Sequence, residues 1–244
     1  MPEGPVIRLL AEKAQPFVGK KVKKATAISD ELDLHILEGK VVSEIIVFGK
    51  QFLICFDKLT VRVHLMLFGY VRFNEKKENG KLRLGLQFEN GELNFYASDV
   101  RFIDEPLDEV YDWSSDVMNP AWDPGAAVRK LNELPKTLAC DALLDQDIFA
   151  GVGNKIKDEV LFLTKVHPRS LVEHLPEKKK REMADAAAAF SFRYLGWKRT
   201  DSEEEHFKAH FKEICPRDKA RLKKEKLGTN QRTTYYCEVC QKKY

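Results

Sequence analysis

The hydrophobic periodicity of this chain changes once, near the middle, and that change limits the folds open to it. Before residue 104, apolar residues alternate with polar ones, as at Val61, Val63 and Leu65, which is the two-residue period of a half-buried strand. Beyond residue 125, apolar residues recur with the spacing of an amphipathic helix. A run of strands followed by a run of helices is typical of an α+β, multidomain protein.

The first part of the chain predicts an antiparallel β-sandwich or barrel preceded by one helix. Residues 5–15 have helical spacing, and short β runs then recur from Val22 to Ile103. Turn-forming pairs separate these runs, namely Gly39-Lys40, Gly49-Lys50, Asn79-Gly80 and Asn90-Gly91. Residues 104–125 contain three prolines and several aspartates, which indicates a linker.

The second part predicts helices followed by a β-hairpin. Helical spacing covers four segments, which are residues 126–134, 138–145, 155–163 and 176–195. We therefore expect three domains: an N-terminal β-sandwich domain with its helix (1–110), a helical domain (111–205) and a basic, zinc-ribbon-like hairpin (206–244).

The charge of the chain is unevenly distributed. The net charge is +3, but residues 206–244 contain eleven Lys or Arg and four Asp or Glu, which leaves +7 there and −4 elsewhere. A basic module of this kind indicates contact with phosphate, or else a solvated, disordered tail.

The sequence also indicates where the protein works. It contains no apolar run long enough to span a membrane and no signal peptide, and Cys55 and Cys140 resemble buried free thiols. We therefore expect a cytoplasmic protein, nucleoid-associated in a prokaryote.

Pro2 offers covalent chemistry at the N-terminus. Removal of Met1 would leave a secondary amine whose reference pKa is about 8. A fraction of the protein molecules therefore carries a neutral, nucleophilic amine at physiological pH. Attack on the anomeric carbon of a sugar gives an iminium ion, which is a strong electron sink. Glu3 could protonate the ring oxygen or shuttle protons. The alternative interpretation is an N-cap before the first helix.

A turn with two glycines connects two of the predicted helices. Gly151 and Gly153 lie in it, and Asn154 stands at the N-terminus of the following helix. Backbone amides and the helix dipole bind phosphate at such a position. An ordinary helix–turn–helix connection is the alternative.

The last three cysteines have the spacing of a metal site. Cys215 and Asp218 are followed, after 18 residues, by Cys237 and Cys240, which predicts the two knuckles of a zinc ribbon. Asp218 stands where a cysteine is expected, and His210 is a second candidate for the fourth ligand. A site without metal is the third option, held by packing alone of Leu222, Leu227, Tyr235 and Tyr236.

Three stretches, in this order, resemble the formamidopyrimidine-DNA glycosylase and endonuclease VIII family of base-excision repair enzymes. They are the start M-P-E-G-P, the helix–two-turn–helix motif L-L-D-Q-x-x-x-A-G-V-G-N and the finger hairpin of residues 231–241. The resemblance implies a bifunctional DNA glycosylase and AP lyase that binds damaged double-stranded DNA. Pro2 would form the Schiff base, with Glu3 as acid–base residue, and β,δ-elimination would nick the strand.

The same resemblance implies phosphate contacts by Lys50, Asn154 and Arg232. Lys50 would contact a phosphate at the lesion from a β-turn, and Arg232 would contact a phosphate from the finger hairpin. Residues 64–69 match the loop that fills the space left by the flipped nucleotide, through Met66, Leu67 and Phe68. Without the resemblance these three residues would be assigned to the core, although three in a row cannot all face one side of a strand.

Arg101 corresponds to a residue that contacts the orphaned base, and the finger implies structural zinc bound by Cys215, Asp218, Cys237 and Cys240. About twenty residues separate Leu195 from Cys215, which is short for the loop with which the family caps oxidised purines. This short separation favours the endonuclease VIII branch, and with it oxidised pyrimidines as substrates. Val6 stands where the family has a glutamate, so a weakened or silent damaged-DNA-binding protein is the alternative. We expect a monomer without an organic cofactor.

Overall fold

The computed structural model describes residues 2–27, 33–77 and 80–244. Met1, and Asn79 of the predicted Asn79-Gly80 turn, lie outside the described residues. The chain forms two compact units, Met1–Tyr111 and Asp112–Tyr244. The three predicted domain boundaries stay predictions.

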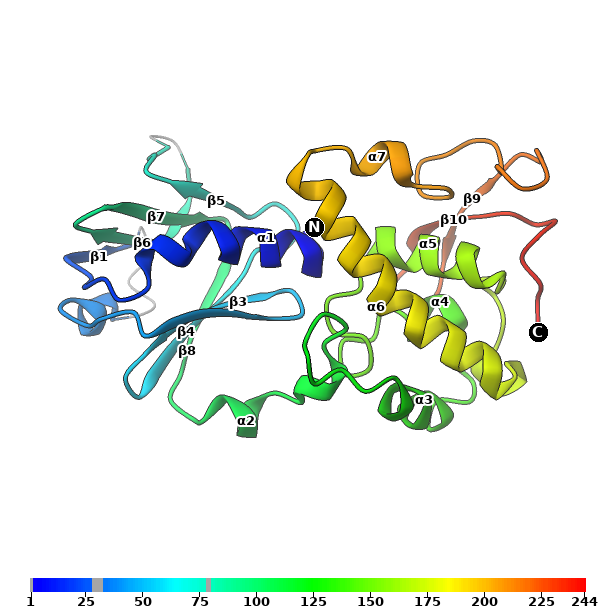
Figure 1. Cartoon of the computed structure of the whole chain (residues 1–244), viewed down its shortest axis with the longest axis horizontal. Coiled ribbons are helices and arrows are strands. Elements are labelled where there is room, and N and C mark those ends of the chain that lie inside the picture. Colours follow the sequence, from blue (N-terminus) through cyan, green and yellow to red (C-terminus); the bar gives the residue numbers. More distant parts are fainter. Residues whose placement is uncertain (1, 28–32, 78–79) are drawn as a thin grey trace. The chain divides into compact units, whose positions relative to one another are not determined.

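The first unit is the predicted β-sandwich with its N-terminal helix (Figure 1). Helix α1 (Gly4–Ala14) precedes two four-stranded antiparallel sheets, with strand orders β1-β6-β7-β5 and β2-β3-β4-β8. The strands are β1 (Lys24–Thr26), β2 (Glu44–Phe48), β3 (Gln51–Phe56), β4 (Leu59–His64), β5 (Tyr70–Phe73), β6 (Leu82–Phe88), β7 (Gly91–Tyr96) and β8 (Asp99–Ile103). The unit also contains two short 3₁₀ turns, η1 (Gln15–Phe17) and η2 (Leu34–Leu37).

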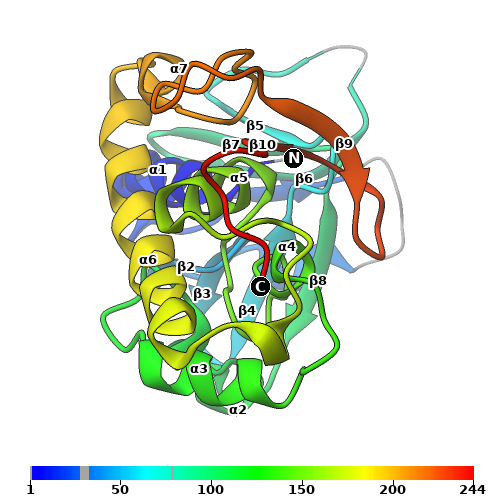
Figure 2. The same ribbon diagram turned by 90° about the vertical axis from the view of Figure 1, so that its right-hand side faces the viewer.

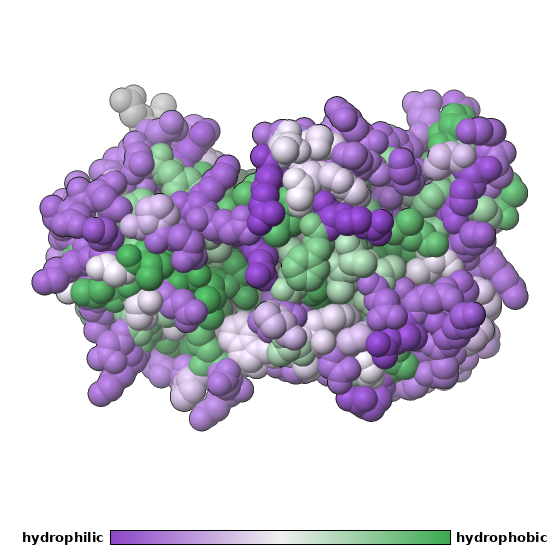
Figure 3. Space-filling model, in the orientation of Figure 1, coloured by the Kyte–Doolittle hydropathy of each residue, from purple (hydrophilic) through white to green (hydrophobic). Residues whose placement is uncertain are grey.

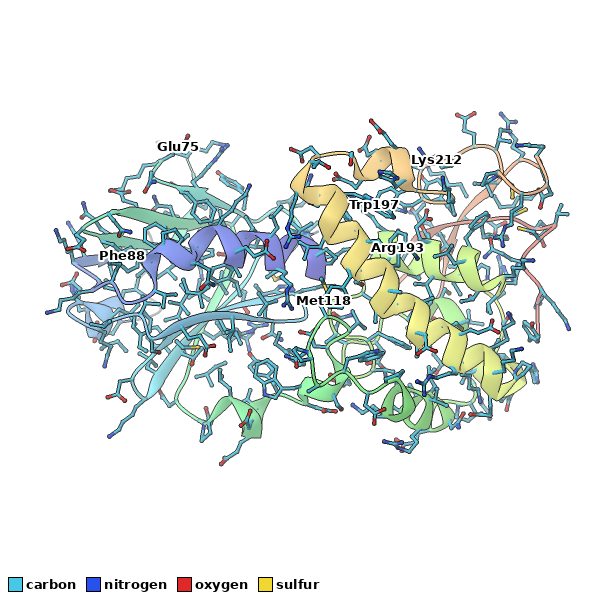
Figure 4. The ribbon with its side chains drawn as sticks, in the orientation of Figure 1. Glu75, Phe88, Met118, Arg193, Trp197 and Lys212 are labelled. Carbon is cyan, nitrogen blue, oxygen red and sulfur yellow. The ribbon has the colours of Figure 1, made fainter. Side chains whose placement is uncertain are left out.

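Alternation along the strands produces one hydrophobic core between these elements. Phe52 and Phe95, from different sheets, meet edge to face with their ring centroids 5.3 Å apart. Phe17 of η1 stacks on Phe88, which is labelled in Figure 4, at 4.8 Å. Helix α1 buries Ile7 against the same core, and each such side chain contributes about 1.5–3 kcal/mol to stability. The helix is therefore fixed to the sandwich along its apolar face.

Residues 104–125 are more ordered than the predicted linker. They contain helix α2 (Leu107–Val110) and the 3₁₀ turn η3 (Trp113–Ser115). Met118, labelled in Figure 4, is 3% exposed, and its N–H donates to Asp116 Oδ1 at 2.9 Å. The boundary between the two units, at Tyr111 and Asp112, falls inside this segment, as expected of a linker. Proline and aspartate mark turns whether a segment is buried or solvated, so they did not indicate its order.

The second unit contains the remaining helices and one β-hairpin (Figures 1 and 2). They are α3 (Pro124–Asn132), α4 (Ala139–Ala142), α5 (Asn154–Thr164), the 3₁₀ turn η4 (Val172–His174), α6 (Glu177–Arg199), α7 (Glu203–His206), and the paired strands β9 (Lys223–Leu227) and β10 (Arg232–Tyr236). Helix α4 ends earlier than predicted because the next eleven residues form the two turns before α5. Helix α6 runs four residues beyond its predicted end and packs on α5 and α3.

Among the described residues, no helix is long and apolar enough to cross a membrane. Figure 3 shows hydrophilic side chains over much of the surface that each unit presents in that view, with hydrophobic ones between them. Cys55 and Cys140 are buried free thiols, as predicted.

Candidate functional site

Pro2 and Glu3 lie at the start of helix α1. Glu3 is the N-cap residue, and its carbonyl oxygen accepts the N–H groups of Val6 (2.9 Å) and Ile7 (3.2 Å). Glu3 is only 3% exposed, whereas Pro2 is half-buried. The N-cap interpretation is therefore confirmed for the backbone of Glu3, and it leaves the chemical roles of both residues as predictions.

Lys50 lies on a tight turn between β2 and β3. Phe48 pairs with Gln51, so Gly49 and Lys50 form a two-residue turn. Gly49 has φ 55°, a left-handed conformation that glycine adopts at little cost. Lys50 is only 8% exposed, which is unusual for a lysine. The predicted hairpin tip is confirmed, and the proposed contact with phosphate stays a prediction.

A polar network that sequence reasoning missed lies beside this turn. Arg62 donates from Nε to Gln51 Oε1 (2.6 Å) and from Nη1 to Asp99 Oδ2 (2.5 Å). Tyr111 donates its hydroxyl to the same Gln51 oxygen at 2.7 Å. Arg101 also pairs with Asp99 Oδ2, at 3.1 Å, and its side chain is 69% exposed. The network joins β3, β4 and β8, and it holds Arg101 at the surface.

The loop after β4 displays three apolar side chains. Met66, Leu67 and Phe68 are 48%, 52% and 79% exposed, so assigning them to the core would have been wrong. The Gly69 N–H donates to the Leu65 carbonyl at 2.7 Å, and a Cβ on Gly69 would lie 2.2 Å from that oxygen. The tight turn therefore requires glycine, and it directs these side chains to the surface of the unit.

His64 supports this loop. Its Nδ1 accepts the N–H of Met66 at 3.3 Å, and Met66 has the left-handed φ of 49°. Burial lowers the pKa of His64, and the charges of Arg62 and Lys50 lower it further. Neutral His64 keeps Nδ1 available as an acceptor.

In the second unit, one side chain holds the two turns between α4 and α5. Gln146 donates from Nε2 to the carbonyls of Leu144 (2.7 Å) and Val152 (3.1 Å), and its Oε1 accepts the N–H of Gly151 (3.2 Å). Gly151 has φ 98°, which side chains rarely tolerate. These hydrogen bonds therefore hold the loop that precedes α5 in one conformation.

Helix α5 begins at Asn154, as predicted. Gly153 is its N-cap, and no side chain caps the helix. The Asn154 side chain, however, donates from Nδ2 to the carbonyl of Thr233 on β10 at 2.6 Å. Asn154 Oδ1 is buried and has no hydrogen-bond partner among the described residues. The residue therefore connects the helix N-terminus to the hairpin.

The next turn of α5 buries an ion pair that the sequence did not reveal. Lys157 and Asp158 are both 0% exposed, with Nζ and Oδ1 3.1 Å apart. Lys157 also donates to the Thr234 hydroxyl on β10 at 2.5 Å, and Asp158 Oδ2 lies 2.7 Å from His210 Nδ1. His210 therefore contacts the buried ion pair and does not belong to the cysteine cluster of the finger. Its proposed role as an alternative metal ligand is wrong.

Glu159 holds the segment before the finger. Its carboxylate accepts the backbone N–H groups of Lys208, Ala209 and His210 at 2.8–3.0 Å. Burial raises the pKa of Glu159, and the three donated hydrogen bonds act in the opposite direction. The residues after α7 are thus fixed to α5 through one buried carboxylate.

Aromatic side chains pack between the end of α6 and the residues around the end of α7. Trp197, near the end of α6 and labelled in Figure 4, stacks on His206 at 4.4 Å. Lys155, in the first turn of α5, has its Nζ 5.7 Å from the ring centroid of Tyr194 and 5.8 Å from that of Phe207. Such cation–π contacts hold the Lys155 charge near the helix N-terminus.

Arg232 begins strand β10, opposite Leu227 of β9. No described carboxylate forms a salt bridge with Arg232, in contrast to Arg169, which pairs with Glu225 at 2.9 Å. The hairpin is anchored to α5 by the contacts of Asn154 and Lys157 as well as by packing. The expectation that packing alone would hold it without metal is therefore wrong.

The four predicted metal ligands come together in the finger. One potential ligand atom from each of Cys215, Asp218, Cys237 and Cys240 lies within 4.8 Å of the others. The sulfurs of Cys215 and Cys240 are 3.8 Å apart, and Cys237 Sγ lies 3.2 Å from Asp218 Oδ2. Tetrahedral Zn–S bonds of about 2.3 Å place two sulfurs about 3.8 Å apart. The cluster therefore has the donors and spacing to bind a metal ion.

Comparison with known proteins agrees with this arrangement. Residues 1–104 match the model of the formamidopyrimidine-DNA glycosylase N-terminal domain, and residues 116–190 match that of the formamidopyrimidine-DNA glycosylase H2TH domain. Endonuclease 8-like 3 of Mus musculus is 27% identical over 217 residues, which cover 86% of this chain and 36% of that protein. Endonuclease 8-like 2 of Mus musculus is 31% identical over 196 residues, which cover 74% of this chain and 57% of that protein.

The fold also matches a solved structure over nearly its whole length. The formamidopyrimidine-DNA glycosylase of Lactococcus lactis, in complex with DNA containing an AP site, has a TM-score of 0.86 at 23% identity, with 99% of this chain and 100% of that chain covered. The chain spans 36–42% of the length of the Endonuclease 8-like 3 proteins that it matches.

Proposed function

Because the chain belongs to the formamidopyrimidine-DNA glycosylase and endonuclease VIII family, in its endonuclease VIII-like branch, we propose that it is a bifunctional DNA glycosylase and AP lyase. The observation that carries the proposal is the match of residues 1–104 of the β-sandwich unit, with Pro2 and Glu3 at the start of α1, together with that of the helix–two-turn–helix. The substrate is damaged double-stranded DNA.

The proposed chemistry begins at the Pro2 nitrogen. Its lone pair attacks C1′ of the damaged nucleotide, the bond from C1′ to the base breaks, and the base leaves with a proton. Glu3 is the proposed proton donor and acceptor. The nitrogen then loses its proton, the C1′–O4′ bond breaks as the ring oxygen takes a proton from Glu3, and the nitrogen lone pair forms the iminium ion. The iminium acidifies C2′–H, and β-elimination expels the 3′ phosphate. A second, δ-elimination then expels the 5′ phosphate.

The proposed DNA contacts come from both units. In the first unit, the exposed side chains of Met66, Leu67 and Phe68 are suited to fill a gap in a base stack. In the second unit, Arg232 and the N-terminus of α5 are suited to bind phosphate. Because such contacts are mainly ionic, we expect affinity to fall steeply with salt.

The remaining elements of the proposal rest on the sequence. The short segment before the finger favours oxidised pyrimidines as substrates. We further propose a cytoplasmic, monomeric enzyme. A silent damaged-DNA-binding protein is the second candidate, favoured by Val6, where the family has a glutamate.

Borohydride trapping tests the proposed function. The unmodified protein, with its N-terminus defined by mass spectrometry, is incubated with a duplex containing one abasic site and then reduced. We expect a covalent protein–DNA adduct at Pro2 and none with the intact duplex. If a preparation with a free Pro2 nitrogen binds the damaged duplex but forms no adduct, the enzyme is excluded and the binding protein is left.

We propose that the metal of the finger is zinc. Three thiolates and one carboxylate form a complete tetrahedral set without an open position, as in structural zinc sites. The ion would hold the loop that begins at Cys215 against the loop that begins at Cys237.

Removal of the Asp218 carboxylate should weaken metal binding. We expect Asp218→Ala to lower zinc affinity by at least the ~10–100-fold that loss of an outer-shell partner costs, and Asp218→Cys to raise it. Competition with a chromogenic chelator measures both values, and Glu213→Ala, which removes an exposed carboxylate nearby, is the control. Equal affinities for Asp218→Ala and the unmodified protein would exclude Asp218 as a ligand.

A further inference from the structure

The hairpin that presents Arg232 has a second attachment, at its tip, which the proposed function does not use. Residues 228–231, here called the hairpin turn, connect β9 to β10. The N–H of Thr229 in this turn donates to both carboxylate oxygens of Asp141, at 3.3 Å and 3.1 Å. Asp141 belongs to helix α4, so the contact joins segments 88 residues apart.

The fit between Asp141 and the turn is close. Gly228 has φ 76°, and a Cβ built on it would lie 1.9 Å from Asp141 Oδ1. The turn is also internally hydrogen-bonded, because Gln231 donates from Nε2 to the Gly228 carbonyl at 2.9 Å. Only glycine at position 228 allows both the turn conformation and the approach of the carboxylate.

Asp141 is itself fixed by its helix. Its neighbours Ala139, Cys140 and Ala142 are each at most 2% exposed, so α4 is packed into the second unit. Asp141 is half-buried and faces a groove of about 430 Å³ at the hairpin turn, which is also lined by Lys136, Arg169 and Lys226. The carboxylate is therefore a rigid acceptor in basic surroundings.

A two-stranded hairpin is at best marginally stable by itself. The positions of its side chains therefore depend on the contacts that attach the hairpin to the rest of the unit. Asn154 and Lys157 hold β10 at Thr233 and Thr234, on the C-terminal side of Arg232. Asp141 holds Thr229, on its N-terminal side. Arg232 thus lies between two attachment points.

We propose that Asp141 is a positioning residue for the Arg232–phosphate contact: its carboxylate fixes the hairpin turn, so that the guanidinium is already in place when DNA arrives. The inference rests on the proposed function, in which Arg232 binds a DNA phosphate. It assigns a DNA-binding role to an acidic residue that touches no DNA.

A double-mutant cycle tests the proposal. The dissociation constant for a duplex with a stable abasic-site analogue is measured for the unmodified protein, Asp141→Ala, Arg232→Ala and the double variant. We expect Arg232→Ala to weaken binding about tenfold and Asp141→Ala about five- to tenfold. The double variant should be no more than about twofold weaker than Arg232→Ala, because both changes remove the same contact.

The salt dependence separates positioning from a general structural defect. Loss of one phosphate contact lowers the slope of log K against log salt by about 0.9, and we expect this change in both single variants. Asp141→Asn keeps one acceptor oxygen and should retain binding within about threefold. Gly228→Ala, which displaces the carboxylate from the other side, should reproduce the loss.

Asp123→Ala is the matched control, because Asp123 also accepts a backbone N–H, that of Gly125 at 2.7 Å, at the start of α3. Its slope and affinity should be unchanged. Additive losses in the cycle, or an unchanged slope in Asp141→Ala, would overturn the inference while leaving the function intact. Failure of the unmodified protein to bind the damaged duplex would instead overturn the function, and the inference with it.

Discussion

Strand cleavage at an abasic site should fall by at least about 10³-fold when one or more residues are added before Pro2. The addition converts the Pro2 amine into a peptide nitrogen, whose lone pair is delocalised into the carbonyl group and no longer attacks carbon. Helix α1 starts at Gly4, so the extension leaves the fold of the first unit unchanged. Affinity for the damaged duplex should stay within a few-fold, because the extension does not alter the phosphate contacts proposed for the second unit.

The measurement combines cleavage of an end-labelled duplex with borohydride trapping and fluorescence anisotropy. Two controls define the cause: the same residues placed at the C-terminus, and a protease site that releases the extension to leave Pro2 free. Activity should be normal in the first control and return in the second. An adduct formed by the extended protein would instead identify another amine as the nucleophile, and Lys50→Ala would then test the lysine of the β2–β3 turn.

The free energy of unfolding should fall by about 3–5 kcal/mol in Glu159→Ala. The substitution leaves the backbone N–H groups of residues 208–210 without their acceptor, and two of these, at Ala209 and His210, are buried. Glu159→Gln should cost much less, because it keeps one acceptor oxygen and removes a buried charge whose pKa burial already raises. For a protein of ordinary stability, about 5–15 kcal/mol, the alanine substitution removes a large share.

Urea unfolding followed by circular dichroism measures these values. Glu133→Ala, which removes an exposed carboxylate at the end of α3, is the control and should change stability by less than about 0.5 kcal/mol. A loss for Glu159→Ala no larger than that of the control would show that water replaces the carboxylate at the three N–H groups.

Much of the fold was predictable because the hydrophobic pattern is regular. The alternation at Val61, Val63 and Leu65 gave the strand β4, and the spacing after residue 125 gave α3, α5 and α6. Boundaries were less accurate where side chains compete with the helix: α4 stops at Ala142, since Gln146 hydrogen-bonds the following loop into turns.

The candidate site was predictable only where its chemistry requires particular residue types at short range. The ligand cluster and the N-terminus of α5 followed from spacing. The buried charges of α5 did not, because Lys157, Asp158 and Glu159 look like an ordinary solvated helix face in the sequence. Lys157 and Asp158 pair with each other, but the remaining partners of these three residues lie 49 or more residues away, and no local pattern indicates which distant groups will hydrogen-bond to them.

The buried charges of α5 also determine when the second unit can be completed during synthesis. Lys157 meets Thr234 only after 77 further residues have been added, which takes a ribosome about 4–15 s. Until then the lysine and its neighbouring carboxylates are more stable in water than in an apolar interior. The nascent unit therefore stays open while its last strand is made, and a chain that stops before residue 234 remains exposed to proteases and chaperones.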